Sequence, residues 1–350
     1  MRILYVTTSM SVGGVQSLVR DLASQFHLRG HQVGIVSLHG EDDVATPQGV
    51  ARFALRLPGG VSQLQGVGAL RRVISSVEPD IVHSHAVHAN VLTALALFPS
   101  QVPLIRTTHS TREGGTALRA ALALTSIPKS VADTAVSDAV ARTSRCIRSP
   151  HVIRHGVDTS RFLFDANART DTRRAAGMAE EECVFVTVGR LVEAKDPELL
   201  IRAFSLLPQP ASRLVWVGDG PERRRIEELV LNLGLRDRVV FPGSTGDVPR
   251  WLSAGDVYVS SSAWEGFGLS MVEALASGLP VVATDVGGTR EALGTRGTLV
   301  KGRDPAVLAG AMTAAATNRS HLRESRLGAE AGSQQRMLDE WESFYRSRSQ

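Results

Sequence analysis

The feature that most constrains the fold is a regular alternation between short apolar runs and longer segments with helical periodicity. Residues 3–7 form such a run, and residues 17–29 follow with apolar side chains at helical spacing, ended by Gly30. We expect strands at residues 3–7, 32–37, 81–84, 104–107, 133–136, 184–188, 213–217, 239–241, 256–259 and 280–284. Strands that alternate with helices predict parallel sheets with crossover helices, so the fold class is α/β.

The chain has 350 residues, which is too long for one typical domain and enough for two with separate cores. A charged, alanine-rich stretch at residues 165–182 separates two rounds of alternation, and we interpret it as a crossing between domains or a first surface helix. We therefore expect an amino-terminal domain at residues 1–160 and a carboxyl-terminal domain at residues 161–334. The last residues, about 335–350, carry an apolar stripe that predicts an amphipathic helix in need of a partner surface. The stripe consists of Met337, Leu338, Trp341, Phe344 and Tyr345.

Composition excludes several classes of protein. Hydrophobic residues make up 43% and charged residues 21%, which is typical of a soluble globular protein. No apolar run reaches the roughly 20 residues that span a bilayer, and the first apolar run is too short for a signal peptide. Cys146 and Cys183 are the only cysteines, so we expect neither a disulfide framework nor a cysteine-based metal site. A cytoplasmic location is the default expectation.

The net charge of +4 is unevenly distributed. Residues 1–160 hold 15 Lys and Arg against 10 Asp and Glu, or +5, while residues 161–350 hold 24 against 25, or −1. A basic amino-terminal half could contact the anionic inner face of a membrane or a phosphorylated acceptor, and ordinary surface arginines explain it equally well. Nucleic acid is disfavoured as a partner, because only 5% of residues are aromatic and no basic cluster is interleaved with them.

Two carboxylates, Glu265 and Glu273, enclose a turn that follows the strand expected at residues 256–259. Gly266 and Gly268 allow a tight bend, and a helix is expected to start near Leu269. The first N–H groups of a helix have no intrahelical acceptor, so a strand, a bend and a helix start together predict a site for a diphosphate. Each acid alone also fits a solvated loop residue or a partner of the helix dipole.

Two cations follow another strand end. Arg190 and Lys195 come after the strand expected at residues 184–188, and Pro197 suits an early position of the next helix. Cations beyond the carboxyl end of a strand could hold a diphosphate, although each could also be plain surface charge.

Glycine pairs occur at two expected loops, Gly13-Gly14 after the first strand and Gly287-Gly288 after residues 280–284. They leave a bare backbone where doubly wound sheets place ligand loops.

Histidines also gather at predicted strand ends. A metal site would need three or four converging ligands, so we expect hydrogen-bonded core or rim residues, with one histidine facing the substrate. They are His83, His85, His88 and His109.

In this order, the motifs resemble those of the family 4 glycosyltransferases, which are retaining enzymes. The resemblance covers nearly the whole chain and implies the GT-B architecture, two facing Rossmann-like domains with a cleft between them. It also implies that the final helix packs back on the first domain. The matching residues are Gly13-Gly14, His155-Gly156-Val157-Asp158 with Phe162, Gly189-Arg190 with Lys195, Gly218-Asp219-Gly220-Pro221, Glu265 with Glu273, and Gly287-Gly288.

The resemblance implies roles for these residues toward a nucleotide-sugar donor. Arg190 and Lys195 would bind its diphosphate and stabilise the leaving group. Glu265 would lie beside the transferred sugar, Glu273 would accept hydrogen bonds from the ribose, and His109 would lie near the donor sugar. Gly13 and Gly14 would shape the phosphate and acceptor side. The backbone that approaches the distal phosphate and the sugar would be that of Gly266, Phe267, Gly268 and Leu269.

Two residues depart from the family pattern. The family often has Asn at the position of His155 and Gly at the position of Asp196. We expect His155 to lie on the hinge side, away from the charged residues, and Asp196 to temper the charge of Lys195.

Glycosyl transfer passes through an oxocarbenium-like transition state while negative charge builds on the diphosphate, so positioning and electrostatics are the main tasks of the protein. Because the cations and the helix start can supply the positive field, we expect no metal and no cofactor beyond the donor. The family is thought to use a front-face route, and we therefore expect that Glu265 is no covalent nucleophile.

The expected donor is a UDP sugar, with GDP second, and the loop at residues 243–247 would meet the base. The expected acceptor is a hydroxyl of a surface polysaccharide or a lipid-linked saccharide. A nucleotide-sugar epimerase of the same fold is the alternative reading. A dehydrogenase is disfavoured because the three-glycine fingerprint is missing, and a non-catalytic sugar-nucleotide binder because the charged motif positions are complete.

Overall fold

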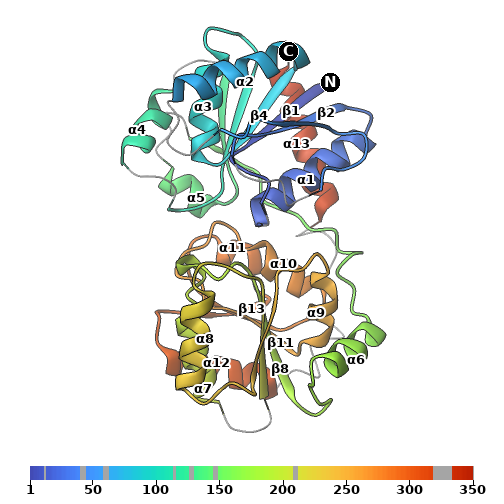
Figure 1. The fold of residues 1–350 in the computed structure, drawn as a ribbon, viewed down its shortest axis with the longest axis vertical. Helices are drawn as coiled ribbons and strands as arrows, with labels where there is room; N and C mark the ends of the chain where they lie inside the picture. Colours follow the sequence, from blue (N-terminus) through green and yellow to red (C-terminus); the bar gives the residue numbers. More distant parts are fainter. Residues whose placement is uncertain are drawn as a thin grey trace. The chain divides into compact units, whose positions relative to one another are not determined.

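The computed structural model describes residues 1–11, 13–39, 45–57, 63–112, 116–125, 130–144, 149–207, 212–317 and 333–349. The chain divides into two compact units (Figure 1). The amino-terminal unit comprises Met1–Arg154 with Gln335–Gln350, and the carboxyl-terminal unit comprises His155–Gln334. The division therefore falls after Arg154, slightly before the boundary expected at residue 160.

The amino-terminal unit is built on a parallel sheet in the order β3-β2-β1-β4-β5-β6-β7. Its strands are β1 (Arg2–Thr7), β2 (Gln32–Ser37), β3 (Ala51–Ala54), β4 (Ile81–His85), β5 (Leu104–Thr108), β6 (Val131–Ala135) and β7 (His151–Val152). Its helices are α1 (Gly14–Leu28), α2 (Gln63–Val77), α3 (Val87–Leu97), α4 (Thr116–Leu124), α5 (Asp138–Thr143) and α13 (Gln334–Arg348). Ser137 caps α5, because its hydroxyl accepts a hydrogen bond from the backbone N–H of Val140 at 3.1 Å.

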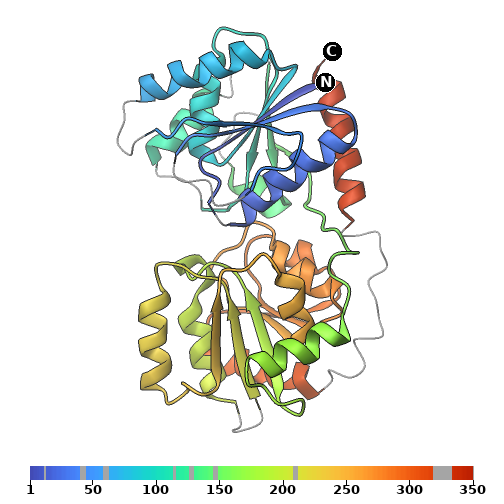
Figure 2. The same cartoon turned by 45° about the vertical axis from the view of Figure 1, so that its right-hand side comes forward.

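Alternating side chains of β1 supply both cores of this unit. Ile3 and Tyr5 point to one face, where α1 and α13 lie side by side (Figure 2). Leu4 and Val6 point to the other face, which α2 and α3 cover. A strand buried on both faces must be apolar at successive positions. This is why the apolar run at residues 3–7 predicted a strand.

A buried chain of hydrogen bonds ties α13 to the sheet. The Tyr345 hydroxyl lies 2.7 Å from His83 Nδ1 and 3.2 Å from the Tyr5 hydroxyl. His83 Nε2 lies 2.7 Å from the Thr107 hydroxyl, which in turn lies 2.7 Å from that of Thr134. The apolar stripe of the final helix thus has its partner surface, and His83 is a hydrogen-bonded core residue.

The direction of this chain follows from its end. Thr134 donates to the carbonyl oxygen of Arg106 at 3.3 Å, and a carbonyl can only accept. Thr107 therefore donates to Thr134, and His83 donates to Thr107 through Nε2. His83 Nδ1 must then accept from Tyr345, which accepts from Tyr5. This arrangement requires a neutral imidazole, in agreement with burial, which sets the pKa of His83 well below its usual value.

The carboxyl-terminal unit repeats the plan in a parallel sheet with the order β10-β9-β8-β11-β12-β13. Its strands are β8 (Cys183–Val188), β9 (Ser212–Val217), β10 (Val239–Gly243), β11 (Val257–Ser260), β12 (Val281–Thr284) and β13 (Gly297–Val300). Its α-helices are α6 (Ala166–Ala175), α7 (Pro197–Ser205), α8 (Arg223–Asn232), α9 (Val248–Ala254), α10 (Leu269–Ala276), α11 (Thr289–Leu293) and α12 (Pro305–Thr317), and one 3₁₀ turn, η1, spans Glu193–Lys195.

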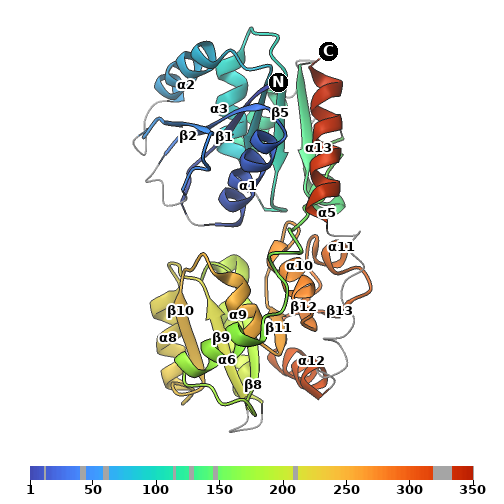
Figure 3. The same cartoon turned by 90° about the vertical axis from the view of Figure 1, so that its right-hand side faces the viewer.

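Helices cover both faces of this second sheet. The helices α7, α8 and α12 share one apolar core with the strands. The helices α6 and α9 pack together, and α9 also contacts β8 (Figure 3). The predicted parallel α/β architecture with two Rossmann-like units is confirmed. Among the helices that the structure describes, none is both long and apolar enough to cross a bilayer.

In both sheets the order of strands reverses once, between β1 and β4 and between β8 and β11. At such a reversal the flanking loops leave in opposite directions and open a crevice at the carboxyl ends of the strands, where α/β proteins bind ligands. In the carboxyl-terminal unit the crevice is flanked by the residues after Val188 and after Ser260, which are the segments that carry Arg190, Lys195 and Glu265.

Candidate functional site

The candidate site lies at the reversal between β8 and β11. Gly189 and Arg190 follow β8 directly, and η1 brings Lys195 back over them. A Cβ atom on Gly189 would lie 3.3 Å from Lys195 Cε, so the lysine stem passes directly over this glycine. The structure therefore brings the two predicted cations into one loop.

Lys195 forms an ion pair with Glu265, a pairing that was not predicted from the sequence. The Lys195 ammonium contacts Oε2 of Glu265, and the Ser262 hydroxyl donates to the same oxygen at 3.1 Å. The two charged side chains are 25% and 14% exposed, so the pair is only partly screened by water. Glu265 is thus held by two donors that come from different loops.

The end of β11 also fixes the backbone of the lysine turn. The Ser261 hydroxyl lies 2.8 Å from the carbonyl oxygen of Lys195 and 3.0 Å from that of Asp196. The backbone N–H of Ala263 donates to the carbonyl of Ala194 at 2.9 Å. From the sequence, the serines at 260–262 predicted only the end of a strand. Their hydrogen bonds to the turn at residues 194–196 were missed, because that turn lies more than 60 residues away.

The carboxylate of Asp196 contacts groups other than the neighbouring Lys195. It caps the start of α7, where it accepts from the N–H of Leu199, and forms an ion pair with Arg303. Pro197 is the first residue of that helix, as predicted.

Arg190 has a different environment from Lys195. Its neighbours are fixed by backbone hydrogen bonds, from Gly189 to Val217 at 2.9 Å and from Leu191 to Asp219 at 3.0 Å. Its own side chain is exposed, and within the part of the chain that the structure describes it makes no ion pair. Arg190 therefore offers an unneutralised guanidinium at the crevice.

The turn between the two glutamates is shaped by glycines from two loops. Gly268, with a φ of 98°, precedes α10, which starts at Leu269 as predicted. Gly287, with a φ of 53°, lies against the carbonyl oxygen of Glu265, and Gly288 lies against that of Gly266. Any Cβ atom at 287 or 288 would overlap those oxygens. The second glycine pair thus lets two loops pack backbone to backbone.

Glu273 lies in the second turn of α10, close to a buried tyrosine. The Tyr258 hydroxyl bonds the Ser270 hydroxyl at 2.7 Å, and burial raises the pKa of Tyr258. Negative charge on Glu273 and Glu265 contributes to this rise. Tyr258 stays a neutral donor beneath the start of α10, and its place in an apolar strand gave no sign of this contact.

His155 lies against the motif, not away from it. Its ring is 5% exposed and meets Phe267 edge-on, with ring centroids 5.8 Å apart. Burial lowers the pKa of His155 to about 4, so the imidazole is neutral at physiological pH. His155 is the first residue of the carboxyl-terminal unit, where the chain passes from one unit to the other, as expected for the hinge side. Its contact with Phe267 also joins it to the turn between the glutamates.

The remaining predicted residues belong to the amino-terminal unit. Gly13 precedes α1, and its carbonyl accepts from Ser17 at 3.0 Å, while Gly14 is the first residue of the helix. His109 Nε2 lies 2.9 Å from Nδ1 of the buried His85. Across the described residues, no group of three or more His, Cys, Asp or Glu side chains could hold a metal ion.

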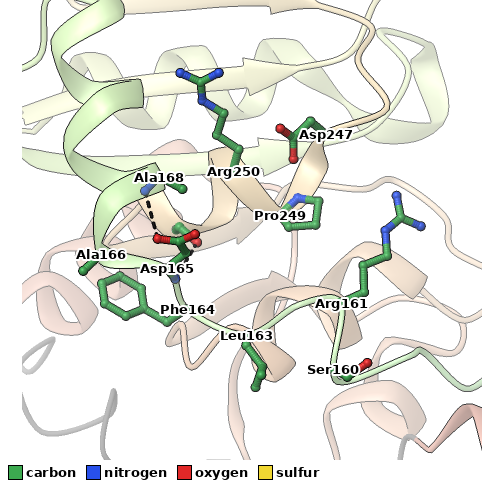
Figure 4. A pocket seen from close by; sticks show the side chains of 11 residues that line it. Ser160, Arg161, Leu163, Phe164, Asp165, Ala166, Ala168, Asp247, Pro249 and Arg250 are labelled. Carbon is green, nitrogen blue, oxygen red and sulfur yellow. Dashed lines mark hydrogen bonds between the residues drawn. The ribbon is translucent and has the colours of Figure 1, made fainter.

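A surface hollow of about 570 Å³ lies elsewhere on the carboxyl-terminal unit (Figure 4). Its walls come from the segment before α6 and from α9, and include Arg161, Phe164, Asp247 and Arg250. Asp247, at the end of the loop expected to meet the base, lines it, whereas Arg190, Lys195, Glu265 and Glu273 do not. We place the candidate site at the crevice instead, because the crevice gathers the charged residues and the glycine turns.

Comparison with known proteins identifies the family of this chain. Residues 168–332 match the family described as glycosyl transferases group 1, and residues 12–161 match glycosyltransferase family 4. The lipopolysaccharide core biosynthesis mannosyltransferase LpsB of Rhizobium meliloti is 37% identical over 160 residues, which are 43% of this chain and 45% of LpsB. The chain thus matches less than half the length of that relative.

A second relative aligns over more of its length. The D-inositol 3-phosphate glycosyltransferase 1 of Catenulispora acidiphila is 30% identical over 362 aligned positions, which cover 91% of this chain and 85% of that enzyme. Among solved structures, HepE of Anabaena in complex with UDP and glucose has a TM-score of 0.85 at 23% identity and covers 99% of each chain. This last likeness concerns the fold.

Proposed function

Because the chain belongs to the family 4 glycosyltransferases, we propose that it moves a sugar from a nucleoside-diphosphate donor to a hydroxyl acceptor. The observation that carries this proposal is the gathering of Arg190, Lys195 and Glu265 at the strand-order reversal, beside the start of α10. Two cations and a helix start supply a positive field for a diphosphate, and a carboxylate supplies a partner for sugar hydroxyls.

Different residues of the site bind different parts of the donor. Arg190, which has no carboxylate partner among the described residues, binds the diphosphate, and Lys195 contacts the leaving phosphate while it keeps its ion pair with Glu265. Glu265 and Glu273 bind the sugar and the ribose. The amide groups of Gly266, Phe267, Gly268 and Leu269 approach the distal phosphate. From the amino-terminal unit, we propose that His109, Gly13 and Gly14 take part in the reaction.

We propose that the transfer retains the anomeric configuration without a covalent intermediate on Glu265. A carboxylate that accepts hydrogen bonds from an ammonium and from Ser262 has its negative charge engaged, so it is a weaker nucleophile. In the proposed route the leaving phosphate helps to deprotonate the acceptor hydroxyl. Recovery of a glycosylated Glu265 peptide after incubation with the donor would overturn this part.

The donor is proposed to be a UDP sugar, with a GDP sugar second. HepE of Anabaena has the same fold and was crystallised with UDP and glucose, which supports uridine as the first choice. The acceptor is proposed to be a surface polysaccharide or a lipid-linked saccharide, in keeping with the name of the relative LpsB. We place the protein in the cytoplasm, with its basic amino-terminal unit contacting the membrane.

The test is a thermal-shift screen against UDP, GDP and ADP, followed by incubation with the matching nucleotide sugars. A ligand that binds only the folded state at 100 times its Kd stabilises it by about 2.7 kcal/mol. Binding of one nucleotide, with sugar released or transferred only when an acceptor is present, supports the proposal. Conversion of the donor sugar into its epimer without an acceptor supports the epimerase instead, and the absence of binding contradicts both.

A further inference from the structure

Asp196 connects the lysine turn to α7 in an unusual backbone conformation. Its φ of 43° and ψ of 60° lie in the left-handed region, where side chains other than glycine are disfavoured. Aspartate tolerates this region better than most residues, since its short side chain can bond nearby backbone groups. Here the carboxylate does so by capping α7, with Oδ1 3.4 Å from the N–H of Leu199.

The cap leaves a negative charge on the residue that directly follows Lys195 in the chain. Asp196 is 7% exposed, so water does little to screen it. An uncompensated carboxylate at this position would offset the charge of the neighbouring lysine and repel an incoming diphosphate. The site therefore needs a cation that neutralises Asp196 without occupying the crevice.

Arg303 supplies that cation from another loop. It lies between β13 and α12, and its Nε and Nη2 atoms lie 2.7 and 2.6 Å from the same Asp196 oxygen, Oδ2. Among the described residues Asp196 is the only ion-pair partner of Arg303. The side chain of Arg303 is 60% exposed, so the guanidinium approaches from the solvent side.

We propose that Arg303 is a positioning residue of the donor site. It neutralises Asp196 and holds the left-handed turn, so that the charge of Lys195 is directed at Glu265 and at the donor diphosphate. Arg303 itself touches no substrate. This inference rests on the proposed function, because it assigns a purpose to the charge of Lys195.

The test compares Arg303→Gln, Asp196→Asn and the double variant. Asparagine keeps the shape, the cap and the tolerance for the left-handed region, but removes the charge that Arg303 balances. We expect Arg303→Gln to weaken UDP or GDP binding and to lower kcat/KM by about tenfold, a change typical of a lost close charge contact. The double variant should recover most of this loss, since it has no charge left to neutralise.

A matched control is Arg225→Gln. Arg225 is a similarly exposed arginine, 52% accessible, that pairs with Glu198 and Glu222 on the surface of the same unit. It should leave nucleotide affinity and kcat/KM unchanged. If Arg303 contributed to stability alone, adding Asp196→Asn to Arg303→Gln would not restore nucleotide binding or kcat/KM.

The outcomes separate this inference from the proposed function. If the wild-type protein binds UDP or GDP and Arg303→Gln binds it equally well, or if the double variant stays impaired, the positioning role is wrong while the proposed function stands. If the wild-type protein binds neither nucleotide, the proposed function fails and the inference falls with it. Loss in Arg303→Gln with recovery in the double variant supports both.

Discussion

Gly287 lies against the carbonyl oxygen of Glu265, although 22 positions separate them in the sequence. The same oxygen accepts a hydrogen bond from the N–H of Gly288 at 3.2 Å. The loop after β12 therefore fixes the backbone of the turn between Glu265 and Glu273. Glu265 owes its position to contacts of its side chain with Lys195 and Ser262 and to a contact of its main chain with the glycine pair.

Substitution of Gly287 tests this packing. We expect Gly287→Ala to lower kcat/KM at least tenfold and to lower the free energy of unfolding by more than about 2 kcal/mol, because the methyl group displaces Glu265. Gly234→Ala is the matched control. Gly234 has a similar φ of 67° at the end of α8, yet nothing lies within 4 Å of its Cβ position, so only backbone strain of about 1 kcal/mol is expected. Equal effects of both variants in enzyme assays and urea unfolding would contradict the prediction.

Removal of either cation of the site should impair catalysis to a similar extent, but only removal of Lys195 should lower the stability of the fold. Arg190→Ala and Lys195→Ala should each remove about 2–4 kcal/mol of transition-state stabilisation, measured from kcat/KM. Arg190 is exposed and unpaired among the described residues, so its loss should leave the melting temperature unchanged. Lys195→Ala leaves the partly buried Glu265 without its counterion and should lower stability by about 1 kcal/mol. The control is Arg224→Ala, since Arg224 is 93% exposed on α8. Normal turnover in both site variants would disprove the assigned roles.

The sequence predicted central elements better than edges. The strand at residues 32–37 and the helix start at Leu269 were predicted at their observed positions, because buried parallel strands are apolar throughout and glycines mark the bend. The strands β3 (Ala51–Ala54), β7 (His151–Val152) and β13 (Gly297–Val300) were missed. All three lie at the edges of their sheets and are partly exposed, so their residues lack a distinguishing apolar pattern.

Individual site residues were predictable, but their pairings were not. Motif spacing identified Lys195, Glu265 and Asp196, whereas the ion pairs of Lys195 with Glu265 and of Asp196 with Arg303 join residues 70 and 107 positions apart. Ion pairs between residues so far apart in the sequence are determined by the fold and cannot be predicted from motif spacing. His83 shows the same limit: it was grouped with possible substrate-facing histidines, and its burial depends on Tyr345, 262 positions away.

The hydrogen-bond chain under α13 predicts unequal costs for its two tyrosines. Tyr345→Phe removes the donor to His83 Nδ1 and leaves that buried acceptor unsatisfied, so we expect a loss of about 2–3 kcal/mol in urea unfolding. Tyr5 is the first donor of the chain. Tyr5→Phe removes one hydrogen bond and leaves Tyr345 still bonded to His83, so we expect a loss of about 1 kcal/mol. A larger loss for Tyr5→Phe would mean that the chain runs in the opposite direction.

Neutral buried histidines should make the fold sensitive to mild acid. The folded-state pKa of His155 is about 4 and that of His83 is well below its usual value, while an unfolded histidine titrates near 6.5. Below about pH 6.5 the unfolded chain therefore binds protons that the folded chain does not. Stability is fully present above that pH and falls by up to about 1.4 kcal/mol per pH unit for each histidine.

For His155 the loss continues down to about pH 4 and totals about 3 kcal/mol. The measurement is the free energy of unfolding in urea at pH 7.5, 6.0 and 5.0. His155→Asn cannot take up the proton, so its stability should fall less steeply with pH than that of the wild type. The exposed His151, changed to Asn, serves as the control and should keep the wild-type slope. If His155→Asn shows the same slope as the wild type, proton uptake at His155 does not destabilise the fold.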